Sequence, residues 1–253
     1  MVSKILISAG GTGGHIFPAL AIADEFRKNG HQVLWIGATN GMEEQVVSAN
    51  EFDIALLDVS GVRRMGFLRL LYMPIMLFKT VAKTIGIIKE FKPDITIGMG
   101  GYVSAPVGVA SLLTGVPLYI HEQNSIPGLT NKLLSRFAQR TLTAFPSAFR
   151  GRKRVTLVGN PVRKEILFAD YNARLVGSHG GPVKVLVLGG SRGATALNNK
   201  LPEVLSRVNE QLQITVWHQC GRGKSQSVQQ IYNSRSVENN VVEFIEKIEE
   251  AYS

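Results

Sequence analysis

The chain has 253 residues, 45% of them hydrophobic, which allows one large domain or two medium-sized domains with apolar cores. Its net charge of +9 favours anionic partners, such as nucleic acid, an anionic membrane surface or a phosphorylated substrate. The single cysteine, Cys220, excludes a disulfide framework within the chain, and no signal peptide or uncharged apolar stretch of about 18 residues occurs.

Short apolar runs alternate with longer helical patterns, which predicts an α/β fold with a doubly wound parallel sheet. Pro18 suggests the start of the first helix, and Gly30 suggests its end. The predicted strands are 4–8, 32–36, 54–58, 94–98, 117–120, 140–144, 155–158, 183–188, 212–217 and 240–244. The predicted helices are 18–29, 67–90, 104–113, 128–138, 194–208 and 225–233.

A glycine-rich loop, residues 9–15, follows the first predicted strand. Its glycines bring the backbone close to a ligand, and the helix start behind them favours an anion such as a phosphate or diphosphate. The loop is not a dinucleotide fingerprint, because Ile16 stands where a glycine is needed, and no Gly-Lys-Ser/Thr follows it. His15 lies beside this anion site, where the helix dipole favours a neutral imidazole that can serve as a general base. The alternative is a histidine that only caps or packs.

Residues 61–92 combine basic and apolar side chains in a helical pattern. This combination suits binding to an anionic membrane surface, and the alternative is a long amphipathic helix with a basic solvent face. Nucleic acid is disfavoured, because no helix-turn-helix, zinc or aromatic-platform signature accompanies the charge. The predicted membrane patch comprises Arg63, Arg64, Phe67, Arg69, Leu71, Tyr72, Ile75, Phe78 and Lys79.

Two further motifs follow predicted strands. Residues 98–104 form a second glycine loop, in which Gly100 and Gly101 precede Tyr102, and its simpler interpretation is a packing turn. Residues 121–125 place polar side chains, including Glu122 and Asn124, after the strand 117–120. Because ligands of open α/β sheets bind at the carboxyl ends of strands, we expect this cluster to contribute to a site. Asn124 could instead cap the next helix.

The third glycine loop, residues 189–193, follows a strand and precedes a helix, as the first loop does. Two such strand–loop–helix units predict two Rossmann-like domains, 1–161 and 162–253, which face one cleft. The break between them is expected after Pro161. Arg163 lies at this junction and could reach a phosphate or pair with a surface acid. The second domain has room for about three strands, where a nucleotide-binding half usually has five or six, so we expect a fragment of a longer protein.

Taken together, these motifs resemble glycosyltransferase family 28, and they match from end to end in order. The segments that carry the resemblance are Gly10–His15 with Phe17 and Pro18, Gly98–Ser104, His121–Asn124, Gly128–Lys132, Gly159–Arg163, Gly189–Ala194 with Leu197 and Asn198, Trp217–Gln219, and Phe244 with Ile245.

The resemblance implies a GT-B fold and an inverting transfer of GlcNAc from UDP-GlcNAc to the MurNAc C4 hydroxyl of lipid I, which forms lipid II. It implies a peripheral protein at the cytoplasmic face of the bacterial plasma membrane. His15 is the first candidate base and Glu122 the second, and Gly100, Gly101 and Tyr102 are implied to bind the acceptor diphosphate. The donor-binding residues carried over by position are Thr12, Gly13, Gly14, Asn124, Arg163, Ser191 and Ile245.

The chain departs from the family pattern in two places. Arg192 stands where the third loop commonly carries glutamine, and the chain ends before the family's later donor-binding segments. The sequence has no Asp-x-Asp motif, so it does not require a bound metal, and no cofactor is expected. The alternatives to the transferase are a non-catalytic fragment that binds lipid diphosphate or membrane only, and another GT-B glycolipid glycosyltransferase.

Overall fold

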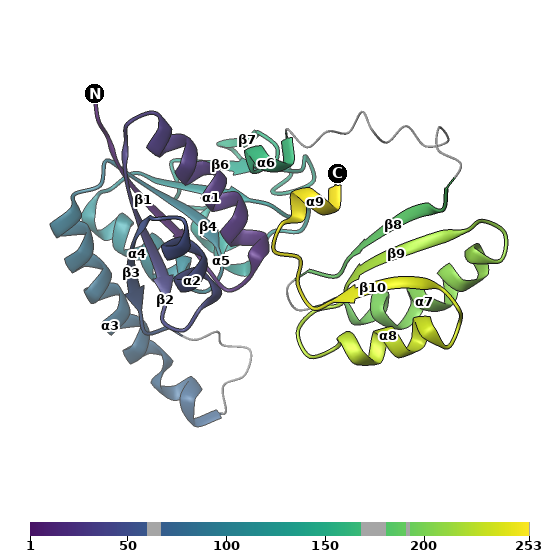
Figure 1. The fold of residues 1–253 in the computed structure, drawn as a ribbon. Helices are drawn as coiled ribbons and strands as arrows, with labels where there is room; N and C mark the ends of the chain where they lie inside the picture. The colour runs from purple at the N-terminus through teal and green to yellow at the C-terminus, as the bar shows by residue number, and fades with distance from the viewer. Residues whose placement is uncertain (60–66, 168–180, 191–192, 253) are drawn as a thin grey trace. The chain divides into compact units, whose positions relative to one another are not determined.

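The computed structural model describes residues 1–59, 67–167, 181–190 and 193–252. The chain divides into two compact units, Met1–Arg163 and Lys164–Ser253. Each unit contains its own sheet (Figure 1). The boundary expected from the sequence, after Pro161, lies two residues before this division.

The first unit contains a seven-stranded sheet in the order β3-β2-β1-β4-β5-β6-β7, with every neighbouring pair parallel. Because β1 lies between β2 and β4, the strand order reverses between β1 and β4, and ligands of such sheets bind at this switch point. The strands are β1 (Lys4–Ala9), β2 (Gln32–Ala38), β3 (Asp53–Leu57), β4 (Ile95–Gly100), β5 (Leu118–Glu122), β6 (Arg140–Thr143) and β7 (Val155–Leu157).

Helices cover both faces of this sheet, because β1, one of its inner strands, is apolar on both sides. Ile5 and Ile7 of β1 belong to a core cluster that includes Leu20 of α1. Leu6, which points to the opposite face, belongs to a second cluster that includes Val107 of α4. The helices are α1 (Gly13–Lys28), α2 (Met42–Ala49), α3 (Phe67–Phe91), α4 (Ser104–Thr114) and α5 (Leu129–Leu134).

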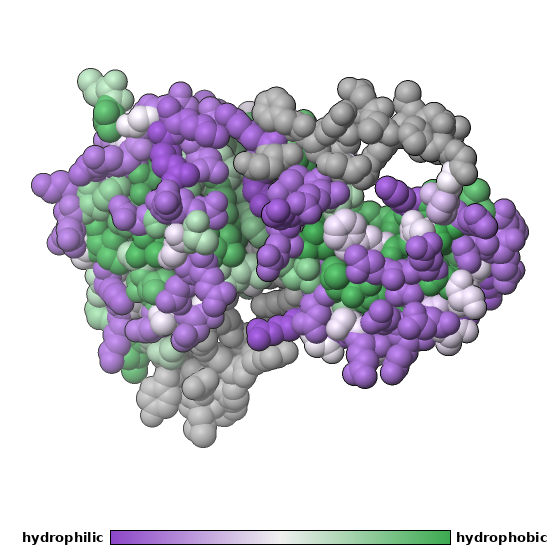
Figure 2. Space-filling view, in the orientation of Figure 1, coloured by the Kyte–Doolittle hydropathy of each residue, from purple (hydrophilic) through white to green (hydrophobic). Residues whose placement is uncertain are grey.

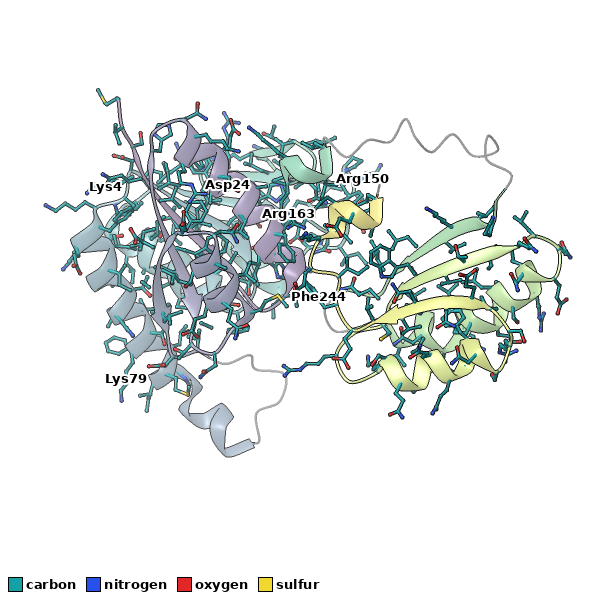
Figure 3. The ribbon with its side chains drawn as sticks, viewed as in Figure 1. Lys4, Asp24, Lys79, Arg150, Arg163 and Phe244 are labelled. Atoms are coloured by element: carbon teal, nitrogen blue, oxygen red, sulfur yellow. The ribbon has the colours of Figure 1, made fainter. Side chains whose placement is uncertain are left out.

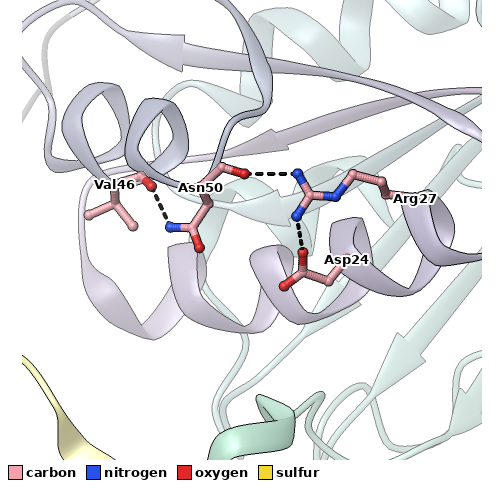
Figure 4. Close-up of polar contacts among 4 residues, drawn as sticks. All are labelled: Asp24, Arg27, Val46 and Asn50. Carbon is pink, nitrogen blue, oxygen red and sulfur yellow. Dashed lines mark hydrogen bonds and ion pairs between the residues drawn. The ribbon is translucent and has the colours of Figure 1, made fainter.

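The end of α2 is tied to α1 through Arg27 (Figure 4). The Arg27 guanidinium donates to the Asn50 carbonyl oxygen at 2.9 Å and to Asp24 Oδ1 at 2.6 Å. It also lies 3.9 Å from the centroid of the Phe52 ring. These contacts fix α2 against α1, and thereby fix the side chains that the first turn of α2 presents.

The second unit contains a three-stranded parallel sheet in the order β10-β9-β8. Its strands are β8 (Val183–Leu188), β9 (Ile214–Gln219) and β10 (Glu238–Val242), and its helices are α6 (Lys164–Leu167), α7 (Thr195–Asn209), α8 (Ser225–Asn233) and α9 (Ile248–Tyr252). Val216 of β9 clusters with Leu205 of α7 and Val228 of α8. In the space-filling view, hydrophilic residues cover much of the visible surface of both units, with apolar residues between them (Figure 2).

Every predicted strand is present, but several helices differ from the prediction. The prediction that the first helix starts at Pro18 is wrong: α1 begins at Gly13 and contains Pro18, which supplies no N–H to the helix. The predicted helix 128–138 is shorter, because α5 ends at Leu134. The short helices α2, α6 and α9 were not predicted, since eight or fewer residues give little periodic signal. In the part of the chain that the structure describes, no helix is both long and apolar enough to span a bilayer.

Candidate functional site

The first glycine loop connects β1 to α1 at the switch point of the sheet. Gly11 has φ +88°, a left-handed conformation that a side chain would strain. Thr12 is the N-cap of α1, and Gly13 and Gly14 are the first two helical residues. The amides of this first turn point out of the helix end, which is where anions bind.

The second glycine loop packs directly against the first. A Cβ on Gly101, whose φ is +83°, would overlap the Gly10 carbonyl oxygen. The Tyr102 ring also packs against the first loop, 3.3 Å from where a Cβ of Gly11 would stand. The two loops therefore form one structure at the ends of β1 and β4, and glycine is required at their contact.

His15 is the third residue of α1 and faces both loops. Its Nδ1 lies 3.2 Å from Thr12 Oγ1, and its Nε2 lies 3.1 Å from where a Cβ of Gly100 would stand. Burial lowers the pKa of His15, and the negative charges of Glu122 and Glu43 oppose this effect only in part. The ring is therefore neutral near pH 7 and can accept a proton.

Glu122, at the end of β5, is buried and accepts hydrogen bonds at both carboxylate oxygens. Oε1 accepts from the backbone N and the side-chain Nδ2 of Asn124, both at 3.0 Å. Oε2 accepts from the Gly128 backbone N and Asn131 Nδ2, both at 3.0 Å. This arrangement favours an organising role for Glu122 over that of second base. The interpretation of Asn124 as a helix cap is wrong, since Gly128 is the N-cap of α5.

His121 links the end of β5 to the segment that leads out of the first unit. Its Nε2 lies 3.0 Å from the Gly159 carbonyl oxygen, and its Nδ1 lies 3.1 Å from Gln123 Nε2. Burial lowers the pKa of His121. Asn160 adds a bond from its Nδ2 to the Gln123 carbonyl oxygen at 3.3 Å. These contacts hold residues 159–163 against the ends of the strands.

Arg163 lies over α1 (Figure 3). Its guanidinium carbon is 4.7 Å from the centroid of the Phe17 ring, and that ring lies 2.9 Å from where a Cβ of Gly13 would stand. The cation is thus held near the N-terminus of α1. Among the described side chains of this region, three buried polar atoms have no hydrogen-bond partner: Arg163 Nε, Gln123 Oε1 and Asn131 Oδ1. Buried polar groups are rarely left unpaired, so these atoms are available to a polar ligand.

The third glycine loop belongs to the second unit and is only partly described. Ser191, a predicted donor-binding residue, and Arg192 lie outside the described residues. A Cβ on Gly193 would overlap the Cys220 carbonyl oxygen. Ile245, also predicted to bind donor, follows β10 and is buried.

A buried polar network lies below this loop. Asn198 Nδ2 donates to the Cys220 carbonyl oxygen at 2.8 Å, and Asn198 Oδ1 lies 3.1 Å from His218 Nε2. His218 Nδ1 lies 3.0 Å from the Tyr232 hydroxyl. Burial lowers the pKa of His218 and raises the pKa of Tyr232 to about 12. Both groups are therefore neutral at physiological pH and serve as fixed hydrogen-bonding partners.

The lowered histidine pKa values predict that the protein loses stability in mild acid. Between pH 6.5 and the folded pKa of each buried histidine, the unfolded chain binds more protons, so the free energy of unfolding falls as the pH is lowered. We expect the urea midpoint to be lower at pH 5 than at pH 7.5. His218→Gln, which keeps hydrogen-bonding capacity without titrating, should reduce this difference. An equal or higher midpoint at pH 5 would contradict the prediction.

The predicted membrane patch is described only in part. Arg63 and Arg64 lie outside the described residues, and Phe67, Arg69, Leu71 and Tyr72 lie in the part of α3 whose side chains are not described. Ile75 and Phe78 are exposed, Phe78 to 75%, and so is Lys79, which is marked on α3 in Figure 3. Apolar side chains thus face solvent beside a basic one.

Glu43 and Asn131 were not predicted as site residues. Glu43 lies in α2, a helix that was not predicted. The sequence did contain a sign of a site there, because Glu43 closely follows a glycine, Gly41, in the loop after a predicted strand. Asn131 was noted only as part of a motif. No cluster of three or more His, Cys, Asp or Glu side chains that could hold a metal ion occurs among the described residues.

Comparison with known proteins finds two family models that match this chain. Residues 5–143 match the glycosyltransferase family 28 N-terminal domain, and residues 184–253 match the glycosyltransferase family 28 C-terminal domain. The chain is 46% identical to a protein of Shewanella denitrificans, with 100% of this chain and 69% of that protein covered. It is 42% identical to a protein of Photorhabdus laumondii, with 99% and 69% covered.

Both relatives are named UDP-N-acetylglucosamine--N-acetylmuramyl-(pentapeptide) pyrophosphoryl-undecaprenol N-acetylglucosamine transferase. Among solved structures, the chain resembles MurG of Acinetobacter baumannii with 31% identity and a TM-score of 0.71, over 98% of this chain and 68% of that one. The predicted fold class, an α/β protein of the GT-B type with two Rossmann-like parallel-sheet domains, is confirmed.

Proposed function

The chain belongs to glycosyltransferase family 28, and from this membership we propose that it transfers N-acetylglucosamine from UDP-GlcNAc to lipid I, forming lipid II. The family resemblance expected from the sequence is thereby confirmed. The observation in the structure that supports this function best is His15, a neutral histidine in the first turn of α1 at the switch point. A base beside an anion-binding helix end is what transfer from a sugar diphosphate to a hydroxyl requires.

The proposed reaction is a single displacement at the anomeric carbon of GlcNAc. The C4 hydroxyl oxygen of the acceptor MurNAc forms a bond to the anomeric carbon of GlcNAc, while the bond from that carbon to the UDP oxygen breaks. The hydroxyl proton passes to His15, and the electron pair of the broken bond leaves with UDP. Attack from the opposite face inverts the anomeric centre. The negative charge that develops on the leaving diphosphate is stabilised by fixed hydrogen-bond donors and cations.

The residues of the first unit divide into two proposed groups. Thr12, Gly13 and Gly14 present the first-turn amides of α1 to the donor, and Arg163 adds a cation held over Phe17. Asn124 is assigned to the donor, as are Ser191 and Ile245 of the second unit. Gly100, Gly101 and Tyr102 are assigned to the acceptor diphosphate, since this loop adjoins both Gly10 and His15.

The function is tested by incubating the protein with UDP-GlcNAc and a short-chain lipid I analogue. The expected product is the acceptor with one added GlcNAc, detected by mass spectrometry, and NMR of the new anomeric proton should show a β linkage. Omitting either substrate should abolish its formation. Binding of the acceptor with no product at any enzyme concentration would instead favour the non-catalytic alternative.

We also propose that the protein binds the cytoplasmic face of the plasma membrane peripherally, through the first half of α3. Exposed Ile75 and Phe78 can enter the headgroup region, and basic residues such as Lys79 attract anionic lipids. The acceptor is itself a lipid, so a membrane-facing helix on the unit assigned to the acceptor fits the proposed reaction.

This membrane role predicts a specific loss on mutation. The double variant Ile75→Ser, Phe78→Ser should weaken binding to anionic phospholipid vesicles by roughly tenfold or more, because each buried apolar side chain contributes about 1.5–3 kcal/mol. Co-sedimentation with vesicles measures the affinity. Val204→Ser, Leu212→Ser removes two exposed apolar side chains of the second unit and serves as the control. Equal losses in the two double variants would contradict a specific role for α3.

A further inference from the structure

Glu43, in the first turn of α2, is fully buried although it carries a carboxylate. Its Oε1 accepts a hydrogen bond from the Ala38 backbone N at 3.0 Å, at the end of β2. Its Oε2 accepts from the Gly11 backbone N at 3.2 Å, in the first glycine loop. The carboxylate thus joins the ends of two neighbouring strands just beneath the proposed site.

Three glycines make room for this side chain. A Cβ on Gly41 would lie 2.5 Å from Glu43 Cδ, and one on Gly37 would lie 2.8 Å from Glu43 Cγ. A Cβ on Gly10 would overlap Glu43 Oε1. Since the first glycine loop, β2 and the turn before α2 each contribute one of these glycines, the backbone of all three segments approaches the same carboxylate.

The position of Glu43 affects His15 in two ways. Its bond to the Gly11 amide fixes the residue before Thr12, and Thr12 Oγ1 in turn lies against His15 Nδ1. Its negative charge also acts on the imidazole directly: Glu122 from β5, the Gly10 backbone and, least of the three, Glu43 from α2 favour protonated His15 against the effect of burial. An imidazolium is the state that His15 reaches when it accepts the hydroxyl proton.

We propose that Glu43 is a positioning residue for the transfer reaction, which holds the first glycine loop in shape and stabilises His15 once that residue is protonated. The inference rests on the proposed function, because it assigns a task to Glu43 within that reaction. The proposed role explains why the Glu43 carboxylate is buried, although it forms no ion pair among the described residues.

The experiment compares Glu43→Gln with Glu44→Gln, which removes the adjacent charge on the same helix. Glu44 is a matched control, because its carboxylate accepts a solvent-exposed hydrogen bond at Oε2 from the Asn40 backbone N. Glu43→Gln keeps the size of the side chain but removes its charge and sets an NH₂ group against a backbone N–H. We expect turnover to fall roughly 10–100-fold in Glu43→Gln, because small displacements of catalytic groups have effects of this size. Glu44→Gln should stay within twofold of the parent.

A second readout needs no turnover. The His15 titration is followed by NMR of ¹³C-labelled histidine in this chain, and its midpoint should move to lower pH in Glu43→Gln and stay unchanged in Glu44→Gln. A parent that forms no product would refute the proposed function, while the titration would still test the link between Glu43 and His15. An unmoved midpoint, or turnover within twofold of the parent, would overturn the inference.

Glu43→Asp covers the case in which Glu43→Gln fails to fold. The shorter side chain keeps its charge but cannot reach both the Ala38 and Gly11 amides. We expect reduced turnover with a His15 midpoint close to that of the parent. Parental turnover in Glu43→Asp would show that the reach of the side chain does not matter and would overturn the positioning role.

Discussion

Replacing His15 by alanine is expected to lower kcat for GlcNAc transfer about 10²–10⁴-fold, the usual contribution of a general base. The imidazole contacts both glycine loops, and burial keeps it neutral and ready to accept a proton. Because the ring acts mainly as the new bond forms, KM for UDP-GlcNAc should change much less than kcat. Initial rates measured over a range of donor concentrations separate the two parameters.

The control for this variant is His31→Ala. His31 lies outside the site, where its Nδ1 accepts from the Ser3 backbone N at 3.1 Å and its ring packs on Phe26. It should keep the parental kcat. If His15→Ala also keeps the parental kcat, His15 is not the base. A rise in KM at unchanged kcat would assign His15 to substrate binding instead.

The strands and glycine loops of the site could be predicted because their signals are local. An apolar run such as Ile5–Ile7 followed by several glycines indicates a strand, a tight turn and a helix start in any context. The start of α1 was misplaced because Pro18 gives a strong local signal, whereas Gly13 and Gly14 are poor helix formers on their own. Tertiary packing of Ile16 and Leu20 outweighs that weakness.

The roles of the acidic residues could not be predicted in the same way. Glu122 was expected as the second candidate base, but its oxygens accept hydrogen bonds from amides of residues 124–131, which come into reach only when that loop folds back. Glu43 gave no sign of burial in the sequence, because the room for it comes from glycines in separate segments, Gly10 and Gly37 among them. Such roles depend on contacts between elements and not on spacing along the chain.

Gly101→Ala is expected to separate the two glycine loops, with large effects on both stability and turnover. The added methyl group would overlap the Gly10 carbonyl oxygen, a backbone atom that cannot rotate away. Left-handed strain of about 1–2 kcal/mol adds to overpacking of about 1–3 kcal/mol, so the free energy of unfolding should fall by roughly 2–5 kcal/mol. A displacement near 1 Å at His15 would lower turnover roughly 10²-fold.

Gly115→Ala is the matched control, because Gly101 precedes α4 and Gly115 follows it, both with positive φ. At Gly115, where φ is +73°, a Cβ would meet no atom within 4 Å, so only the left-handed strain remains. We expect a loss of about 1–2 kcal/mol and parental turnover from this variant. Urea unfolding and initial rates measure the free energy of unfolding and the turnover of both variants. The difference between the variants gives the contribution of the contact between the loops. If Gly101→Ala behaves like Gly115→Ala in both measurements, the close packing of the loops is not what holds His15 in place.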